Sequence, residues 1–146
     1  MPKATFYTHV SDADSFTCRL TARAAQAGGR VLVWSDSAEQ IEQLDQALWH
    51  YEAESFLAHE IWQPDTPMPS ETAVLLASGN TLPTIPADTT VLNLSADFWS
   101  SALTIPERTL EIIGSGLEEL ADARQRFQAY RRQGVVTEHH NMNGKA

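Results

Sequence analysis

The sequence predicts one α/β domain in three layers, with a mostly parallel five-stranded sheet between helices on both faces. Runs with strand character alternate with runs of helical periodicity along the chain, which is the order expected of such a fold. The run at Arg30–Trp34 is almost continuously hydrophobic, as in a parallel strand that is covered on both sides. A length of 146 residues suits a single domain with a substantial core.

Four elements are expected in the N-terminal part of the chain. In order they are a strand at Ala4–Val10, a helix from about Phe16 to Ala27, a strand at Arg30–Trp34 and a helix from Asp36 to about Trp49. Gly28 and Gly29 end the first helix, because glycine readily adopts the conformation that follows a helix terminus. Asp36 with Glu39 three positions later resembles a capping box and marks the start of the second helix.

The segment from His50 to Glu71 interrupts this alternation. It contains three prolines, and a connection of this length in a compact domain is usually functional or disordered. Beyond it the expected elements are strands at Thr72–Ser78 and Thr90–Ser95, a helical turn near Ala96–Ala102, a strand at Arg108–Ile113 and a helix at Leu117–Gln133. Residues 137–146 show no periodicity and are expected to form a flexible tail, so the domain is predicted to cover residues 1–136.

The last predicted helix combines an apolar face with a cluster of arginines. Its apolar residues recur at helical spacing and are Leu117, Leu120, Ala123, Phe127 and Tyr130. The cluster holds four of the ten lysine and arginine residues, namely Arg124, Arg126, Arg131 and Arg132. Arg124 and Arg131 lie one heptad apart on the edge beside Phe127, in a chain of net charge −9. Such a spot suits a short anionic peptide or a carboxylate, although acidic residues before basic ones also stabilise any surface helix through its dipole.

Composition and charge argue against several classes of protein. A net charge of −9 disfavours a broad nucleic-acid surface, so contact with DNA is expected only through a partner. No apolar run is long enough for a membrane span, and the N-terminus lacks a signal-peptide pattern, so a cytoplasmic protein is expected. The single cysteine, Cys18, is expected to be a buried thiol in the first helix.

The ends of the predicted strands carry polar side chains that suggest an alternative function. A small α/β enzyme, such as a hydrolase, would use His9, Asp36 and either Ser78 or Ser95 as base, orienting group and nucleophile. No G-x-S-x-G motif frames these serines, and helix capping explains the same residue types, so no catalytic residue is assigned.

Cofactor and metal sites are not predicted either. The turn after the first strand has no glycine to cradle a phosphate, and its aspartates would repel one. His139 and His140 lie in the expected tail without a third ligand at suitable spacing. His50 and His59 are isolated, and each is expected to be a hydrogen-bonded structural histidine.

Four aromatic residues lie within fourteen positions around the end of the second helix, namely Trp49, Tyr51, Phe56 and Trp62. Large aromatic side chains in an irregular segment either attach it to the core or present anchors to a partner. The residues alone leave both interpretations open.

Several motifs together give the chain a family resemblance. They are ATFY at Ala4–Tyr7, GGRVLVW at Gly28–Trp34, QLDQALWHYEAESFLAH at Gln43–His59, and EII followed after a turn by ARQRFQAYRRQG. In these motifs, spread over nearly the whole chain, the sequence resembles the chi subunit of the bacterial DNA polymerase III holoenzyme, an accessory of the clamp loader. The resemblance implies a Rossmann-like fold without a working nucleotide site, and a non-catalytic adaptor.

The same resemblance implies two interfaces. Chi subunits bind the acidic C-terminal tail of single-stranded DNA-binding protein, which ends in a phenylalanine with a free carboxylate. By position, the tail-binding residues here would be Ile113, Arg124, Phe127, Gln128 and Arg131. Trp49 and Phe56 would contact the psi subunit of the clamp loader or an XPD-type helicase.

The chain departs from the family pattern at two positions of the tail site. Leu120 stands where a basic residue is expected one turn before Arg124, and Phe127 stands where a tyrosine is common. Loss of one exposed cation weakens such a contact by roughly 0.2–1 kcal/mol, so the site is expected to persist.

Overall fold

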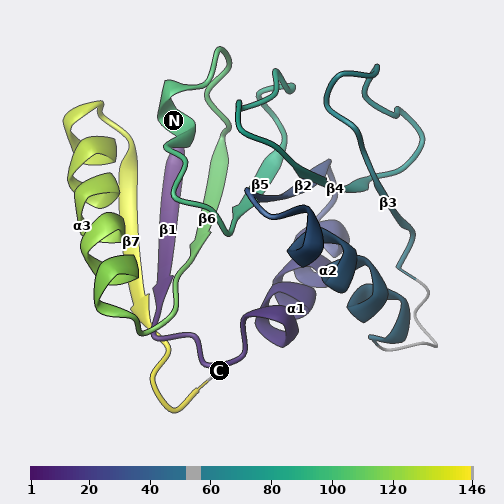
Figure 1. The fold of residues 1–146 in the computed structure, drawn as a ribbon. Coiled ribbons are helices and arrows are strands. Elements are labelled where there is room, and N and C mark those ends of the chain that lie inside the picture. Colours follow the sequence, from purple (N-terminus) through teal and green to yellow (C-terminus); the bar gives the residue numbers. More distant parts are fainter. Residues whose placement is uncertain (52–56, 146) are drawn as a thin grey trace.

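The chain folds around one parallel sheet. The structure is a computed structural model that describes residues 1–51 and 57–145, and within these residues seven strands pair in the order β3-β4-β2-β5-β6-β1-β7 (Figure 1). All six pairs of neighbouring strands are parallel. The elements are β1 (Lys3–Thr8), α1 (Ala13–Gln26), β2 (Val31–Ser35), α2 (Ala38–His50), β3 (His59–Ile61), β4 (Val74–Ser78), β5 (Thr90–Asn93), the 3-10 helix η1 (Trp99–Ser101), β6 (Arg108–Ile112), α3 (Leu117–Arg132) and β7 (Val136–Asn141).

Helices cover both faces of the sheet, as the sequence predicts. Alternate residues of the strands, such as Val31 and Val33, pack with α1 and α2 in one core cluster. On the opposite face Ala4 and Phe6 of β1 pack against α3. Figure 1 shows α3 beside β7 and β1 at one end of the sheet, whereas α1 and α2 lie toward the other. The three-layer α/β architecture is therefore confirmed.

The part of the second face that α3 leaves uncovered is packed by loops. Trp34 of β2 meets Trp99 of η1 edge to face, with ring centroids 5.8 Å apart. Trp62 joins this buried cluster, and its indole Nε1 donates to the carbonyl of Thr66 at 3.1 Å. Trp62 therefore attaches the proline-rich segment after α2 to the core, which is one of the two roles open for the aromatic residues.

Within the residues that the structure describes the sheet has seven strands, and the prediction of five is wrong. β3 is a three-residue strand inside the proline-rich segment, where no run of apolar residues marks it. β7 includes Thr137–Asn141 of the predicted flexible tail, and it pairs with β1 along its whole length from Lys3↔Val136 to Thr8↔Asn141. Its side chains are mostly exposed, so backbone pairing and not burial defines it.

The local signals for α1 and α2 are largely confirmed. α1 ends before Gly28 and Gly29, which have φ values of +89° and +87°. The start of α2 needs a correction, because its N-cap is Ser37, whose hydroxyl accepts a hydrogen bond from the backbone nitrogen of Gln40 at 3.1 Å. Asp36 therefore precedes the cap. Cys18 is buried in α1 as expected, and burial together with nearby carboxylates raises its pKa to about 11.

A buried ion pair attaches α3 to the sheet. Glu111 of β6 is fully buried, and the guanidinium of Arg126 donates to its Oε1 from Nε at 3.2 Å and from Nη2 at 3.0 Å. The hydroxyl of Tyr130 donates to Oε2 at 3.0 Å. Asn93 Nδ2 donates to both oxygens at 3.1 and 3.0 Å. The carboxylate thus has partners from α3 and from the neighbouring strand β5.

Burial raises the pKa of Glu111, and the charge of Arg126 and the hydrogen bonds from Asn93, Tyr130 and Arg126 oppose that rise. Burial also raises the pKa of the Tyr130 hydroxyl, with the charge of Glu111 and its hydrogen bond adding to the rise, so the phenol remains a donor.

None of the helices in the described part of the chain has the length and apolar character needed to cross a bilayer.

We expect the substitution Arg126→Met to destabilise the fold by about 3–5 kcal/mol at pH 8, because it leaves Glu111 buried without a counter-charge. The folded-state pKa of Glu111 would then rise further above its ordinary value of 4.5, so folding would favour the protonated carboxyl. The stability that the folded variant gains from protonation of Glu111 is present at low pH and is lost as pH rises. Urea unfolding should therefore show a smaller deficit at pH 5 than at pH 8.

Arg132→Met is the matched control for this substitution. Arg132 lies on the same helix and is exposed, so its replacement should change the unfolding free energy by about 0.5 kcal/mol or less at either pH. Equal stability losses for the two variants would contradict the assigned role of the Glu111–Arg126 pair.

Candidate functional site

The exposed edge of α3 carries the arginines and the aromatic ring that the sequence singles out. Arg126 and Tyr130 are turned toward the sheet, where both contact Glu111. With this orientation fixed, Arg124 and Arg131 are exposed, and Phe127 between them is half-buried. Two hollows share the Phe127 side chain, and one of them is lined by Arg124 and the other by Arg131. This arrangement supports the prediction that the three residues lie along one edge of the helix.

The first hollow lies between α3 and the ends of β1 and β7, and we call it the α3 hollow. Its volume is about 270 Å³. Apolar side chains from β1 and α3 form one part of its wall, namely Phe6, Leu120, Ala123 and Phe127. Polar side chains form the rest, namely Thr8, His9, Arg124 and His139. The hollow therefore offers an apolar surface next to a guanidinium and two imidazoles.

The second hollow, which we call the β7 hollow, also borders Phe127. It is more open, has a volume of about 430 Å³, and is lined by Phe127, Arg131, Gly134, Val135, Val136 and Thr137. The guanidinium carbon of Arg131 lies 6.0 Å from the centroid of the Phe127 ring, at the outer limit of a cation–π contact. Each hollow thus combines Phe127 with one arginine.

Phe127 is held in place by β1. Its ring meets that of Phe6 edge to face with centroids 5.2 Å apart, and Phe6 also meets Tyr130 at 5.8 Å. A partner entering either hollow would therefore meet a fixed aromatic wall.

Arg124 and Arg131 are available for an external anion. Among the ion pairs formed by the described residues, none includes either side chain. Arg126 differs, because its charge is used by Glu111 inside the protein. The sequence interpretation that placed Arg126 in the exposed basic cluster needs this correction. Leu117, expected on the apolar face, is instead 86% exposed at the first position of the helix.

Two other predicted tail-site residues lie apart from these hollows. Ile113 is 3% exposed, belongs to the core cluster beneath α3, and borders a smaller hollow with Asp122 and Arg126. Gln128 is exposed on α3, one turn after Arg124, and is not among the residues that line the α3 or β7 hollow.

Sequence reasoning did not assign the polar residues Thr8, His9 and His139 of the α3 hollow to the tail site. The Thr8 hydroxyl lies 2.7 Å from Nε2 of His139, and Nδ1 of His9 lies 3.2 Å from the hydroxyl of Ser115. The sequence interpretation considers His9 only for the enzyme alternative, and it places His139 in the predicted tail. The pairing of β7 with β1 brings His139 beside Phe6, a contact between residues far apart in sequence that no local pattern could indicate.

Two residues of the enzyme alternative, Ser95 and His9, make separate contacts. The Ser95 hydroxyl donates to Asn93 Oδ1 at 2.7 Å and lies 3.0 Å from Asp97 Oδ2, which also accepts from the indole of Trp34 at 2.7 Å. His9 follows β1, whereas Asp36 follows β2, and two strands lie between them. The described contacts therefore hold Ser95 in a structural turn and do not join it to His9.

The aromatic residues near the end of α2 differ in exposure, because Trp62 is buried and Trp49 is not. Trp49 is 43% exposed, and its ring centroid lies 4.3 Å from that of His59. His59 is a hydrogen-bonded structural histidine as predicted, with Nδ1 2.8 Å from the Leu57 carbonyl and Nε2 3.1 Å from the Asp45 carbonyl. Phe56 lies outside the described residues.

The parallel sheet defines an α/β protein. The two hollows beside its last helix, α3, form a candidate binding site for an anionic, partly apolar ligand. The family model described as DNA polymerase III chi subunit, HolC, matches residues 1–138, and the chain belongs to this family. A search among curated proteins found no match. Membership supports a role as a subunit of DNA polymerase III and association with that complex.

Proposed function

We propose that this protein is a non-catalytic adaptor that links the DNA polymerase III clamp loader to single-stranded DNA-binding protein. It does so by binding that protein's acidic C-terminal tail at the edge of α3. The observation that carries the proposal is the α3 hollow, where Arg124, without an internal ion pair, stands beside an apolar wall. Family membership makes this ligand the natural candidate.

The α3 hollow suits the terminal residue of such a tail. At about 270 Å³ it is smaller than the roughly 300–1,000 Å³ typical of pockets for drug-sized ligands, so it fits one side chain with its carboxylate. The terminal phenyl ring packs against Phe127 and Leu120. The carboxylate accepts charge-assisted hydrogen bonds from the guanidinium of Arg124.

The β7 hollow continues the site for the residues upstream. Arg131 lines this hollow together with Phe127 and is positioned to meet an aspartate of the tail. Gln128 lies between Arg124 and Arg131 along the helix and can donate to the peptide backbone. Ile113 supports the site from beneath α3 and does not contact the peptide.

Trp49 marks a second interface on the opposite half of the molecule. Its ring is 43% exposed at the end of α2, and large exposed aromatics are frequent anchors of protein interfaces. We propose that this surface binds the psi subunit or an XPD-type helicase, with Phe56 contributing. Nucleic acid is then reached only through the partners, which agrees with the net charge of −9.

The first prediction for this function concerns the free carboxylate. A labelled acidic peptide that ends in phenylalanine should bind at least about tenfold more tightly than the same peptide with an amidated C-terminus, because charge-assisted hydrogen bonds to Arg124 would be lost. Fluorescence anisotropy measures both affinities. Equal affinities for the two peptides would rule out carboxylate capture.

Charge reversal at Arg124 gives a second test. Arg124→Glu should weaken peptide binding by about a hundredfold, since it removes the carboxylate's partner and adds a repulsive charge. Arg23→Glu is the matched control, because Arg23 is exposed on α1 and gives the same change in net charge. Circular dichroism should show both variants folded. Equal losses in the two variants would mean that only overall charge matters.

The second interface has its own prediction. Trp49→Ala should weaken binding to the psi subunit or to the helicase by about 2 kcal/mol, the usual loss at an aromatic hot spot, and leave tail-peptide binding unchanged. Leu103→Ala is the control, because Leu103 is 90% exposed in the loop after η1. Calorimetry with each purified partner measures the effect. Full affinity for both partners in the Trp49→Ala variant would place the interface elsewhere.

A further inference from the structure

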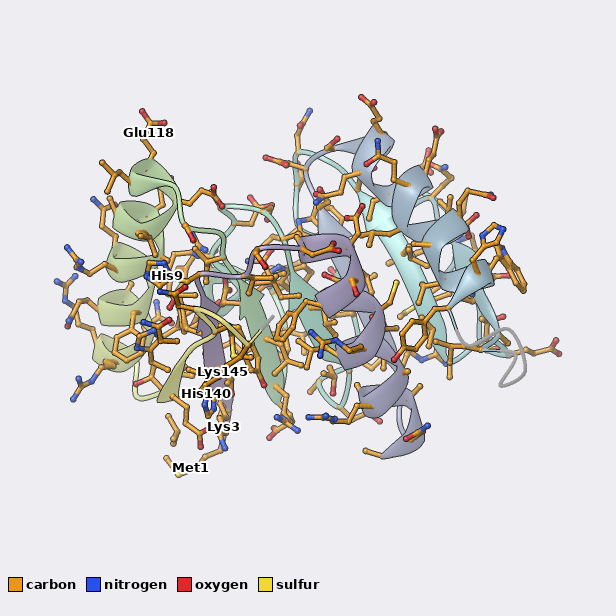
Figure 2. All side chains as sticks on the ribbon, turned by 90° about the horizontal axis from the view of Figure 1, so that it is seen from below. Met1, Lys3, His9, Glu118, His140 and Lys145 are labelled. Atoms are coloured by element: carbon orange, nitrogen blue, oxygen red, sulfur yellow. The ribbon has the colours of Figure 1, made fainter. Side chains whose placement is uncertain are left out.

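The polar side of the α3 hollow contains more than Arg124. Two imidazoles from different strands line it, that of His9 at the end of β1 and that of His139 on β7. Figure 2 shows His9 beside α3, on the side of the molecule where β1 ends. The hollow thus gathers three nitrogen-bearing side chains around one small volume.

Each imidazole has one nitrogen in an internal contact. Nε2 of His139 lies 2.7 Å from the Thr8 hydroxyl, and Nδ1 of His9 lies 3.2 Å from the Ser115 hydroxyl. Among the described residues, Nδ1 of His139 and Nε2 of His9 have no further hydrogen-bond partner. These contacts position both rings and leave one nitrogen of each for a ligand.

The backbone conformation of His9 is a second observation at the α3 hollow. His9 has φ +58° and is the one residue other than glycine with positive φ in the described chain. Only a few per cent of non-glycine residues adopt this left-handed conformation, and histidine is enriched among them together with asparagine and aspartate. Residues in sparsely populated backbone regions cluster at binding and catalytic sites, and His9 lies at the wall of a hollow.

We propose that His9 and His139 form, together with Arg124, the carboxylate-binding end of the α3 hollow. The affinity for a free C-terminus then rises as pH falls. This inference rests on the proposed function of the hollow and adds two binding residues to it. The part of the ligand bound there is a terminal carboxylate next to an aromatic side chain.

Proton uptake explains the pH dependence. Histidine is the side chain that ordinarily changes charge between pH 5 and 8, and a protonated imidazole donates hydrogen bonds from both nitrogens. Arg124 and the peptide's carboxylates keep their charges over this range. A bound carboxylate therefore favours protonated rings, and lower pH favours binding.

Several charged groups surround the two rings. Arg124 on α3 lines the same hollow. The carboxylate of Glu119, in the first turn of α3, accepts a hydrogen bond from the Gly114 nitrogen at 3.0 Å, next to Ser115. On β7, Glu138 and His140 pair with Thr5 and Tyr7, so they belong to the opposite face, and Glu138 contacts Lys3 at 2.6 Å. Asp12, after β1, caps α1 by accepting from Ser15.

The test measures peptide affinity at pH 6 and pH 8 with the full-length protein. The probe is the acidic peptide ending in phenylalanine, with its amidated twin in parallel. The wild type should bind the free peptide about four- to ninefold more tightly at pH 6, from about two- to threefold for each of the two rings. The amidated peptide should show little of this gain.

The variant that removes both imidazoles is His9→Asn with His139→Gln. Asparagine tolerates the positive φ at position 9, so the backbone there is preserved. This variant should keep the wild-type affinity at pH 8 within about threefold and lose most of the gain at pH 6. The control is His140→Gln, since His140 neighbours His139 but stacks on Tyr7 with ring centroids 5.4 Å apart on the other face. The control should keep the full gain.

A gain at pH 6 that is the same in the double variant and in the wild type would overturn the assignment of His9 and His139. The assignment would also be overturned if the wild type favoured the free peptide over the amidated peptide by the same factor at both pH values. Both of these results would leave the adaptor function standing. Equal binding of free and amidated peptide at either pH would overturn both proposals. Imidazole NMR signals of His9 and His139 should shift on addition of peptide, and that of His50 should not.

Discussion

The buried contact between Glu111 and Arg126 determines which side of α3 meets solvent. Residues of an α-helix are spaced about 100° apart around its axis, so Arg124 lies about 200° from Arg126. With Arg126 fixed on the carboxylate of β6, Arg124 is turned outward. Tyr130 reinforces this orientation with a second bond to the same carboxylate. An ion pair that contributes little net stability by itself can therefore still define the geometry of a binding surface.

Strand order places the candidate site at the end of β1. The chain leaves β6, forms α3, and returns as β7, so that β1 lies between the two strands that α3 connects. The helix therefore crosses over Phe6, and the last residues of β1 open into the α3 hollow. Ligands of α/β proteins commonly bind beyond the carboxyl ends of the strands. Here the position is retained, although no glycine-rich turn for a phosphate follows β1.

The sequence was most informative where burial produces a pattern. Periodicity predicted α3 from Leu117 to within one residue of its end, and it identified the edge shared by Arg124 and Phe127. It could not predict β7, because an exposed edge strand is held by backbone hydrogen bonds and needs no apolar alternation. His139 was missed for the same reason. Nor could composition distinguish Arg126, whose partner Glu111 is fifteen positions away on a strand.

Electrostatics at the candidate site must act over a short range. A body of net charge −9 repels an acidic tail at a distance, and exposed charges beyond about 10 Å are largely screened at 0.1 M salt. Favourable binding must then come from groups in direct contact with the ligand, where partial burial reduces screening. Arg124 and the two imidazoles meet this condition in a hollow whose other wall is apolar. Because added salt screens the long-range repulsion as well as the local attraction, the net salt dependence of binding is expected to be weaker than the local charges alone would give.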